Sequence, residues 1–182
     1  MEEILVVIDM QKDFIDGTLG SEEAVRIVPA VIRKIKEYVK KNNAIFFTKD
    51  THTPQYLETQ EGRKLPVVHC VKNSKGWEFQ EDIKQWVEEL QAKTERRLVF
   101  EKGIFGSEAL ASTLRSQFTG EEISIELVGL CTDICVIANA MLLRSFMPEA
   151  IIKVDASCCA GVTPESHSIA LEAMKMCQVE IK

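Results

Sequence analysis

Long hydrophobic runs are missing from this sequence: nowhere do the roughly 18 consecutive apolar residues of a membrane-spanning helix occur. The first residues, MEEILVVIDMQKDF, are acidic where a secretory signal would be basic, and their apolar stretch is too short for one. We therefore expect a cytoplasmic protein with no membrane partner. The chain also lacks internal repeats and low-complexity segments, so its 182 residues predict one globular domain, 1–182.

The six cysteines include no Cys-x-x-Cys pair, which argues against a structural zinc site. Without a secretory signal they should be reduced thiols. The chain also lacks a basic cluster: 22 lysines and arginines face 28 acidic residues, and the net charge is −6. We therefore expect no nucleic-acid partner. Histidines number only three, so a site built on imidazole must use His52, His69 or His167.

Short apolar runs alternate along the chain with segments of helical apolar spacing. Strands are expected at 4–8, 44–48, 98–100, 122–130, 150–155 and 178–182. Helices are expected at 24–41 with Pro29 near the start, at 79–91, after Ser107, at 134–147 and at 164–176. This alternation predicts an α/β fold: a three-layer α/β/α, doubly wound, mostly parallel six-stranded sheet. Such sheets bind ligands at the carboxyl ends of their strands.

The segment Gly129–Val136, GLCTDICV, joins an expected buried strand to a helix. It places Cys135 in the first turn of that helix, where free backbone N–H groups and the helix dipole lower the pKa of a thiol. Most cysteines of a cytoplasmic chain are simply small buried apolar side chains, so the position alone does not establish a nucleophile.

Asp9, Asp50 and Lys102 each stand at or just after the end of an expected strand. In a doubly wound sheet these ends face the crevice that Cys135 would also line. A carboxylate could accept the thiol proton while a lysine holds the thiolate. The alternative is a cysteine–histidine pair, and only His167 remains for it if the other two histidines bind a metal. We therefore favour a carboxylate base, although most lysines are ordinary surface residues.

Periodicity stops between Thr51 and Trp77, a stretch long enough to suggest a functional loop or disorder. His52 and His69 lie in it, with Glu58 and Glu61 between them. Imidazoles combined with carboxylates suit Zn²⁺, Fe²⁺ or Mn²⁺. Spacing alone is a weak signal, and it favours ordinary polar loop residues over a metal site.

A set of motifs in this chain resembles the isochorismatase-like cysteine hydrolases, and within them the nicotinamidase/pyrazinamidase branch. The motifs are IDMQKDF (8–14), DTH (50–52), LPVVHC (65–70), FEKGIFG (100–106) and GLCTDICV (129–136). They follow the order of the family and extend over nearly the whole chain. The resemblance implies metal-dependent hydrolysis of a small amide, nicotinamide or pyrazinamide, to a carboxylate and ammonia through a thioester.

The resemblance also implies roles for individual residues. It implies a catalytic triad of Asp9, Lys102 and Cys135, and an oxyanion hole from the backbone N–H groups of Cys131 and Cys135 beside a non-proline cis peptide bond. It implies one divalent metal ion, with zinc as the first candidate and iron or manganese as alternatives. The implied ligands are Asp50, His52, His69 and Glu61, with Glu58 as an alternative to Glu61.

The chain departs from the family in the loop around the second metal histidine. Relatives often carry a tryptophan just before that histidine and Gly-Thr or Gly-Ser soon after it, where this chain has Leu65 and Asn73-Ser74. An aromatic contact to the substrate ring would then come from Phe14, Trp77 or Phe105, although each is by default a packing residue.

Two other functions stay open from the sequence. One is a related cysteine amidase that acts on an N-carbamoyl or ureido substrate; such relatives generally lack the DTH and second-histidine pattern. The other is a non-catalytic family member that binds a small ligand or a partner protein. A homo-oligomer is also compatible with the sequence.

Overall fold

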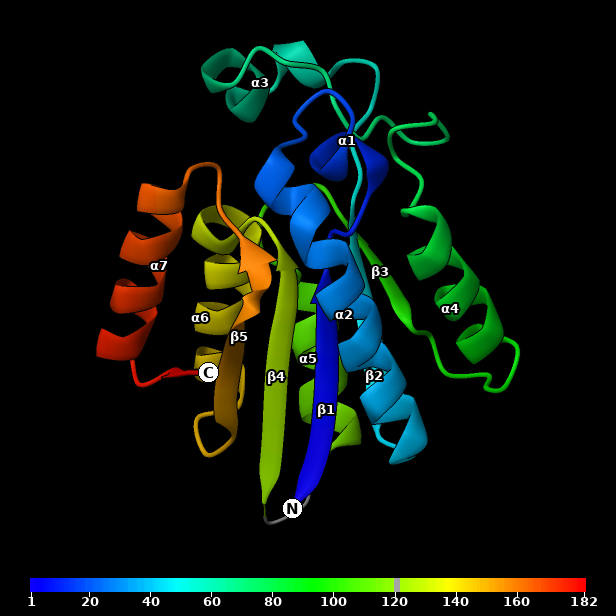
Figure 1. Ribbon diagram of the computed structural model, residues 1–182, viewed down its shortest axis with the longest axis vertical. Coiled ribbons are helices and arrows are strands. Elements are labelled where there is room, and N and C mark those ends of the chain that lie inside the picture. The colour runs from blue at the N-terminus through cyan, green and yellow to red at the C-terminus, as the bar shows by residue number, and fades with distance from the viewer. Residues whose placement is uncertain (120–121) are drawn as a thin grey trace.

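The computed structural model describes residues 1–119 and 122–182, and its central element is a six-stranded sheet (Figure 1). The strands are β1 (Glu2–Ile8), β2 (Ala44–Asp50), β3 (Val99–Lys102), β4 (Ile123–Leu130), β5 (Ile151–Ala160) and β6 (Glu180–Ile181). Their order is β3-β2-β1-β4-β5-β6, and each neighbouring pair is parallel. The predicted doubly wound α/β fold is confirmed.

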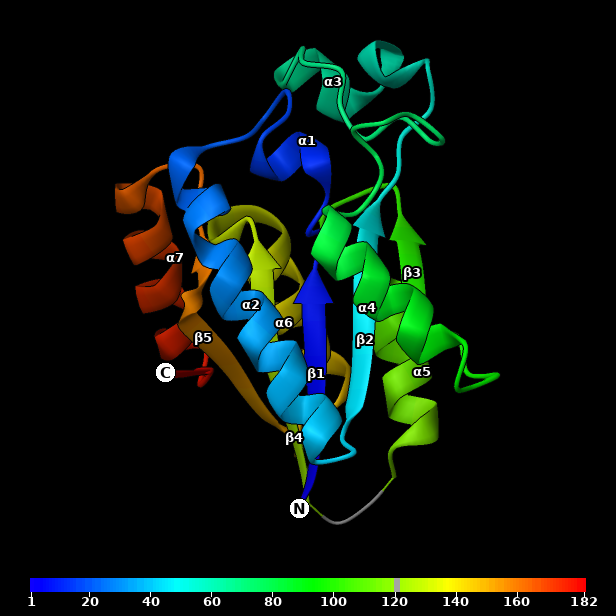
Figure 2. The same ribbon diagram turned by 45° about the vertical axis from the view of Figure 1, so that its right-hand side comes forward.

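Helices cover both faces of this sheet (Figure 2). On one face lie α2 (Glu22–Lys40) and α4 (Glu81–Gln91), and on the other α5 (Glu108–Gln117), α6 (Ile137–Phe146) and α7 (Pro164–Met176). Two short helices, α1 (Lys12–Ile15) and α3 (Gln60–Lys64), lie beyond the carboxyl ends of the strands (Figure 1). In residues 1–119 and 122–182, no helix combines the length and the apolar character that crossing a bilayer requires.

The apolar runs of the sequence became the inner strands. Ile4 to Ile8 of β1 are fully buried, and every residue of β4 is buried, because helices cover both faces of the sheet there. These strands hold the carboxyl edge of the sheet in place, and that edge carries the polar residues described below.

Helix α2 begins earlier than its apolar spacing indicates. The Ser21 side chain accepts a hydrogen bond from the Ala24 backbone N–H, which caps the helix and starts it at Glu22. Pro29 therefore lies inside α2 and not near its start.

Two other segments are more regular than predicted. The loop expected between 51 and 77 contains a 3₁₀ turn, Tyr56–Glu58, and α3, which Thr59 caps by accepting from the Gly62 N–H. Strand β5, expected to end at Asp155, continues to Ala160, because it pairs again with β4 beyond an irregularity between Leu127 and Gly129.

A charged cluster is buried between α2 and the sheet. Glu126 of β4 is 2% exposed, accepts a 2.7 Å hydrogen bond from the Tyr38 hydroxyl, and lies 3.3 Å from Lys34 Nζ. The same Lys34 Nζ lies 2.7 Å from Asp155 Oδ2, and Lys182 Nζ is 3.2 Å from Glu126. Lys34 is thus the cation shared by two carboxylates that burial alone would penalise.

Replacing Lys34 by methionine should lower the free energy of unfolding by about 3 kcal/mol at pH 7, because Asp155 loses its cation and Glu126 keeps only the exposed Lys182. Burial alone would raise the pKa of Glu126, but the Tyr38 hydrogen bond and the charge of Lys34 lower it. Burial would likewise raise the pKa of Asp155, and its hydrogen bond with Lys34 lowers it.

These two pKa values are lower in the folded than in the unfolded chain, so the stabilisation exists above about pH 4.5 and is lost as the pH falls through the folded-state values. Urea unfolding should therefore show that Lys34→Met lowers the free energy of unfolding less at pH 3 than at pH 7. Lys36→Met, which changes an exposed lysine of α2, is the control. Equal losses at the two pH values would contradict the pairing.

Candidate active site

The carboxyl ends of four neighbouring strands carry the candidate catalytic residues. Asp9 follows β1, Asp50 ends β2, Lys102 ends β3, and Cys135 follows β4. The parallel register pairs Asp50 directly with Lys102. Residues that are far apart in sequence therefore meet at one edge of the sheet, as the strand ends predicted.

The Lys102 ammonium group lies between two carboxylates and a thiol. Its Nζ atom is 2.6 Å from Asp9 Oδ2, 3.3 Å from Asp50 Oδ1 and 3.4 Å from Cys135 Sγ. Each of these four residues is at most 6% exposed. Because water is largely excluded, the charges act on one another far more strongly than they would at the surface.

Burial and these neighbours set the protonation of the group. Burial would lower the pKa of Lys102, but the charges of Asp9, Cys135 and Asp50 raise it, so the lysine stays protonated. Burial raises the pKa of Asp9 despite the nearby ammonium. Burial also raises the pKa of the Cys135 thiol, and the Asp9 carboxylate adds to the effect. The expectation that the helix start lowers this pKa is therefore wrong, and the thiol requires a base.

Asp9 is oriented by a residue that the sequence analysis missed. The Thr48 hydroxyl donates a 2.7 Å hydrogen bond to Asp9 Oδ1 and accepts one of 3.2 Å from the Asp9 backbone N–H. Asp9 itself has a left-handed backbone, with φ of 46°. Its remaining oxygen is thereby aimed at Lys102. A polar residue in the otherwise apolar run AIFFT was the signal for Thr48.

Cys135 lies in a π-helical turn, Thr132–Val136, that leads into α6, and not in an α-helical first turn. The N–H groups of Ile134 and Val136 both donate to the Cys131 carbonyl, at 3.1 and 3.0 Å. The peptide bond between Leu130 and Cys131 is cis. The turn therefore brings the backbone of Cys131 close beside that of Cys135.

Two further residues hold this turn in place. Gly129 has φ of 116°, and a β-carbon there would lie 2.1 Å from the Ile8 carbonyl oxygen, so the close approach of β4 to β1 requires glycine. The Asn139 side chain donates to the carbonyls of Cys135 and Phe105, at 2.7 and 3.1 Å. Sequence reasoning gave no role to Asn139, because these contacts are made only after folding.

Asp50 also belongs to a second group of side chains. Its Oδ2 atom lies 2.9 Å from His52 Nε2 and 3.5 Å from His69 Nε2. One potential ligand atom from each of the three residues lies within 4.8 Å of the others. Glu61 of α3 approaches the same group, with Oε1 3.8 Å from His52 Nε2. Glu58 is exposed, so Glu61 is the carboxylate that the fold brings to the histidines.

The chemistry of these donors fits a divalent metal ion. In the part of the chain that the structure describes, His52 Nε2 is buried and makes no well-aligned hydrogen bond, although Asp50 Oδ2 lies 2.9 Å away. His69 Nδ1 lies 2.8 Å from the Val67 carbonyl, and since a carbonyl only accepts, Nδ1 carries the proton. In the neutral ring, Nε2 of His69 then carries a lone pair that can bind a metal ion together with Asp50, as in metal-binding histidines whose other ring nitrogen donates to the backbone.

A cavity of about 300 Å³ connects the two groups. Cys135, Asp50, Glu61 and His69 contribute to its wall, and the apolar lining residues include Phe14, Leu19, Leu65, Phe105, Ile134 and Val162. The Phe14 ring lies 5.5 Å from the His69 ring, centroid to centroid. A thiol and potential metal ligands therefore face one small, mostly apolar space, the typical setting of a small-molecule site.

Comparison with known proteins agrees with this arrangement. The family model of the isochorismatase domain matches residues 3–181. The chain belongs to the isochorismatase family. The resemblance that the sequence motifs carry is therefore confirmed.

Three similar proteins match along nearly their whole length. The uncharacterized isochorismatase family protein PncA of Bacillus subtilis is 28% identical, with 94% of this chain and 93% of that protein covered. The pyrazinamidase of Pyrococcus horikoshii, solved in complex with zinc, is 27% identical, with a TM-score of 0.81 and coverage of 100% and 99%. The N-carbamoylsarcosine amidase of Thermoplasma acidophilum shares the fold, with a TM-score of 0.77 at 23% identity and coverage of 100% and 96%.

The remaining candidate residues of this isochorismatase-family chain lie away from the cavity. Trp77 donates to the Thr51 hydroxyl at 2.8 Å, and Lys49 Nζ sits 3.1 Å from the centroid of its ring. The structure thus removes Trp77 from the candidates for ring contact, while Phe14 and Phe105 line the cavity. His167 Nδ1 lies 2.7 Å from the Thr132 hydroxyl, whereas the thiol faces Lys102 and Asp9.

Proposed function

We propose that this isochorismatase-family chain is a metal-dependent cysteine amidohydrolase that converts nicotinamide, and also pyrazinamide, to the ring carboxylate and ammonia. One observation supports this function most: the same 300 Å³ cavity borders the Cys135 thiol and the Asp50–His69 group. A pyridine carboxamide presents an electrophilic carbon at one end and a ring nitrogen at the other. The 27% identical pyrazinamidase from P. horikoshii, solved with zinc, gives further support.

The first half of the proposed reaction breaks the amide bond. Asp9 accepts the proton of the Cys135 thiol, and the thiolate attacks the carboxamide carbon. The backbone N–H groups of Cys131 and Cys135 donate to the oxygen that becomes negatively charged. Asp9 then returns the proton to the amide nitrogen, ammonia leaves, and the acyl group stays on Cys135 as a thioester. Lys102 remains charged throughout and stabilises both the carboxylate and the thiolate.

The second half releases the acid. Asp9 accepts a proton from a water molecule, whose oxygen attacks the thioester carbon beside the same N–H groups. The carbon–sulfur bond breaks, Cys135 recovers its proton from Asp9, and the ring carboxylic acid forms and loses its own proton to water. Asp9 therefore acts twice as base and twice as acid, which requires the fixed position that Thr48 gives it.

Asp50, His52, Glu61 and His69 would hold one divalent metal ion, with zinc as the first candidate. When bound there, the ion supplies a Lewis-acid position for the ring nitrogen of the substrate. Phe14 and Phe105 would contact the ring from the apolar walls of the cavity. A substrate held there by a ring nitrogen would direct its carboxamide toward Cys135, which borders the same cavity.

Removing the metal should abolish nicotinamide hydrolysis, and readdition of zinc should restore it. Benzamide, which keeps the carboxamide but lacks the ring nitrogen, should show a KM higher by about tenfold or more, the loss of roughly 1.4 kcal/mol of binding free energy. Ammonia release on a panel of nicotinamide, pyrazinamide, benzamide and ureido compounds, with metal analysis of the same sample, measures both effects.

A matched pair of variants makes this test specific to the ligands. Glu61→Gln should lower the metal content of the purified protein, whereas Glu58→Gln, in the adjacent 3₁₀ turn, should leave it unchanged. If the purified protein holds no stoichiometric metal, is unaffected by chelators and is equally active on benzamide, these residues are ordinary polar residues of the loop and bind no metal. Turnover of ureido compounds in place of nicotinamide would establish the other amidase activity.

A further inference from the structure

The turn that carries Cys135 is held by α7, a helix to which the proposed reaction gives no role. Thr132, the first residue of the turn, is fully buried. Its hydroxyl oxygen lies 2.7 Å from His167 Nδ1. His167 belongs to the N-terminal part of α7, so this hydrogen bond joins two elements that are 35 residues apart.

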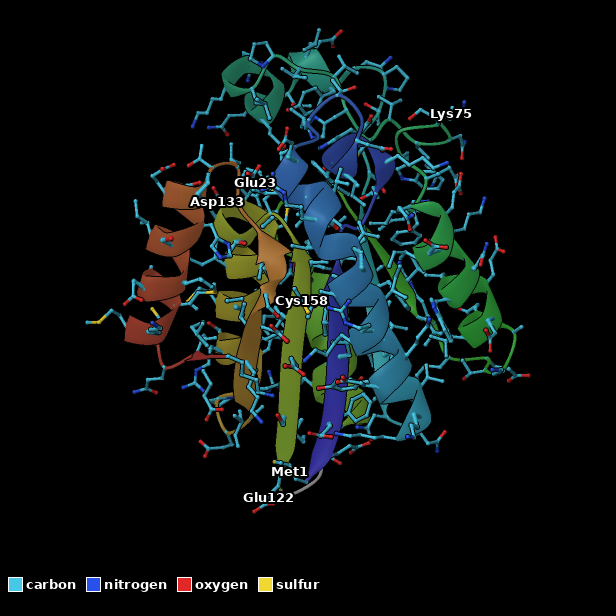
Figure 3. The ribbon with its side chains drawn as sticks, in the orientation of Figure 1. Met1, Glu23, Lys75, Glu122, Asp133 and Cys158 are labelled. Atoms are coloured by element: carbon cyan, nitrogen blue, oxygen red, sulfur yellow. The ribbon has the colours of Figure 1, made fainter. Side chains whose placement is uncertain are left out.

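The next residue of the turn makes a second link to the same region. Both carboxylate oxygens of Asp133 accept from the Val162 backbone N–H, at 3.2 and 3.1 Å. Val162 lies in the connection between β5 and α7 and lines the active-site cavity. Figure 3 shows Asp133 where the start of α6 meets this connection. Consecutive residues of the turn are therefore bound to α7 and to the segment that leads into it.

The support behind His167 is itself rigid. A β-carbon on Gly161 would lie 2.8 Å from the His167 backbone nitrogen, so the end of β5 packs directly against α7 at this point. Thr163 caps the helix reciprocally with Ser166. The imidazole is thus carried by a helix whose start is fixed, and His167 lines a second depression that adjoins the active-site cavity at Gly161.

We propose that His167 is a positioning residue: through Thr132 it holds the π-helical turn so that the N–H groups of Cys131 and Cys135 face the carbonyl oxygen of the substrate. This role rests on the proposed amidase function and extends it to α7. His167 touches neither the thiol nor the substrate cavity, and it acts only through the Thr132 hydroxyl. The hydrogen bond, and not proton transfer, is what the reaction needs from it.

Replacing His167 by asparagine distinguishes a hydrogen-bonding role from a role in proton transfer. Its side-chain amide places a hydrogen-bonding atom near the position of Nδ1 but cannot serve as a base near neutral pH. His167→Asn should therefore keep kcat for nicotinamide within about threefold of wild type. His167→Leu removes the partner of a buried hydroxyl and should lower kcat by about 10- to 100-fold with little change in KM, less than the roughly 10²- to 10³-fold loss of a whole oxyanion donor.

Amide hydrogen exchange of the peptide that contains residues 131–136 supplies a readout independent of activity. It should accelerate in His167→Leu, stay at the wild-type rate in His167→Asn, and stay there in the control Ser168→Ala, which changes an exposed neighbour on α7. Thr132→Val removes the same hydrogen bond by deleting the Thr132 hydroxyl. This variant replaces His167→Leu in the test if His167→Leu does not fold. The double variant Thr132→Val/His167→Leu should be no slower in kcat than the worse single variant.

Wild-type kcat and exchange in both His167→Leu and Thr132→Val would overturn the proposal. So would a His167→Asn variant as inactive as His167→Leu but with wild-type exchange, because His167 would then act in proton transfer. If the wild-type protein hydrolyses no amide at all, the proposed function fails, and exchange alone decides whether His167 holds the turn.

Discussion

Cys135→Ala should lower the rate of nicotinamide hydrolysis at least about a thousandfold, a barrier increase of roughly 4 kcal/mol. The thiol is the atom that would bond to the carboxamide carbon, and alanine offers no replacement. The fold should survive, because Cys135 is a small residue whose backbone contacts, including the Asn139 bond to its carbonyl, are kept. Ammonia release under saturating substrate measures the effect.

Cys131→Ala is the matched control for this change. The Cys131 side chain lines the same cavity, but only its backbone N–H has a role in the proposed reaction. Most of the wild-type turnover should therefore remain. Residual activity of Cys135→Ala above about a thousandth of wild type would show that Cys135 is not the nucleophile.

Asp9→Asn should lower turnover by about a thousandfold, within the range for losing a general acid–base group. The amide cannot accept the thiol proton. If the oxygen of the introduced asparagine accepts from the Thr48 hydroxyl, its NH₂ group faces the Lys102 ammonium. In the wild-type protein that ammonium lies 2.6 Å from Asp9 Oδ2. The rate of Cys135 alkylation by iodoacetamide should fall together with kcat, since both need the thiolate.

The control for Asp9→Asn is Asp16→Asn, which changes an exposed aspartate after α1 and should leave both rates unchanged. Circular dichroism of both variants checks that the fold is kept. If Asp9→Asn stays active while both His167→Ala and His167→Asn are silent, the cysteine–histidine mechanism is correct and the carboxylate mechanism is wrong.

The sheet and its polar edge were predictable because the sequence signal is local. ILVVI and the apolar run before Gly129 are strands that can be buried only if both faces are covered, and that requirement specifies a central parallel sheet. Once the strands are parallel, residues at their carboxyl ends must gather. Asp9, Asp50 and Lys102 could therefore be placed together without any knowledge of their side-chain contacts.

The details of the site depended on contacts that form only in the folded chain. Spacing could not decide between Glu58 and Glu61, because a 3₁₀ turn and the start of α3 determine which carboxylate faces the histidines. Trp77 was a reasonable candidate for ring contact until the fold placed Lys49 over its ring. The bond between His167 and Thr132 joins elements that no local pattern connects.

The prediction for the Cys135 thiol failed for a related reason. A helix start lowers the pKa of an exposed thiol, but Cys135 is buried and lies beside the Asp9 carboxylate, and both effects raise the pKa. The sequence indicates where a residue lies along an element, whereas its desolvation depends on everything packed around it.

Capture of the acyl group by hydroxylamine tests the thioester on Cys135 most directly. A covalent acyl-enzyme can transfer its acyl group to either water or the added nucleophile. With nicotinamide as substrate, we expect nicotinate and nicotinohydroxamate together, in a ratio that shifts toward the hydroxamate as hydroxylamine increases, and neither product from Cys135→Ala. Nicotinate alone at every hydroxylamine concentration, with ammonia release unchanged, would contradict the thioester mechanism.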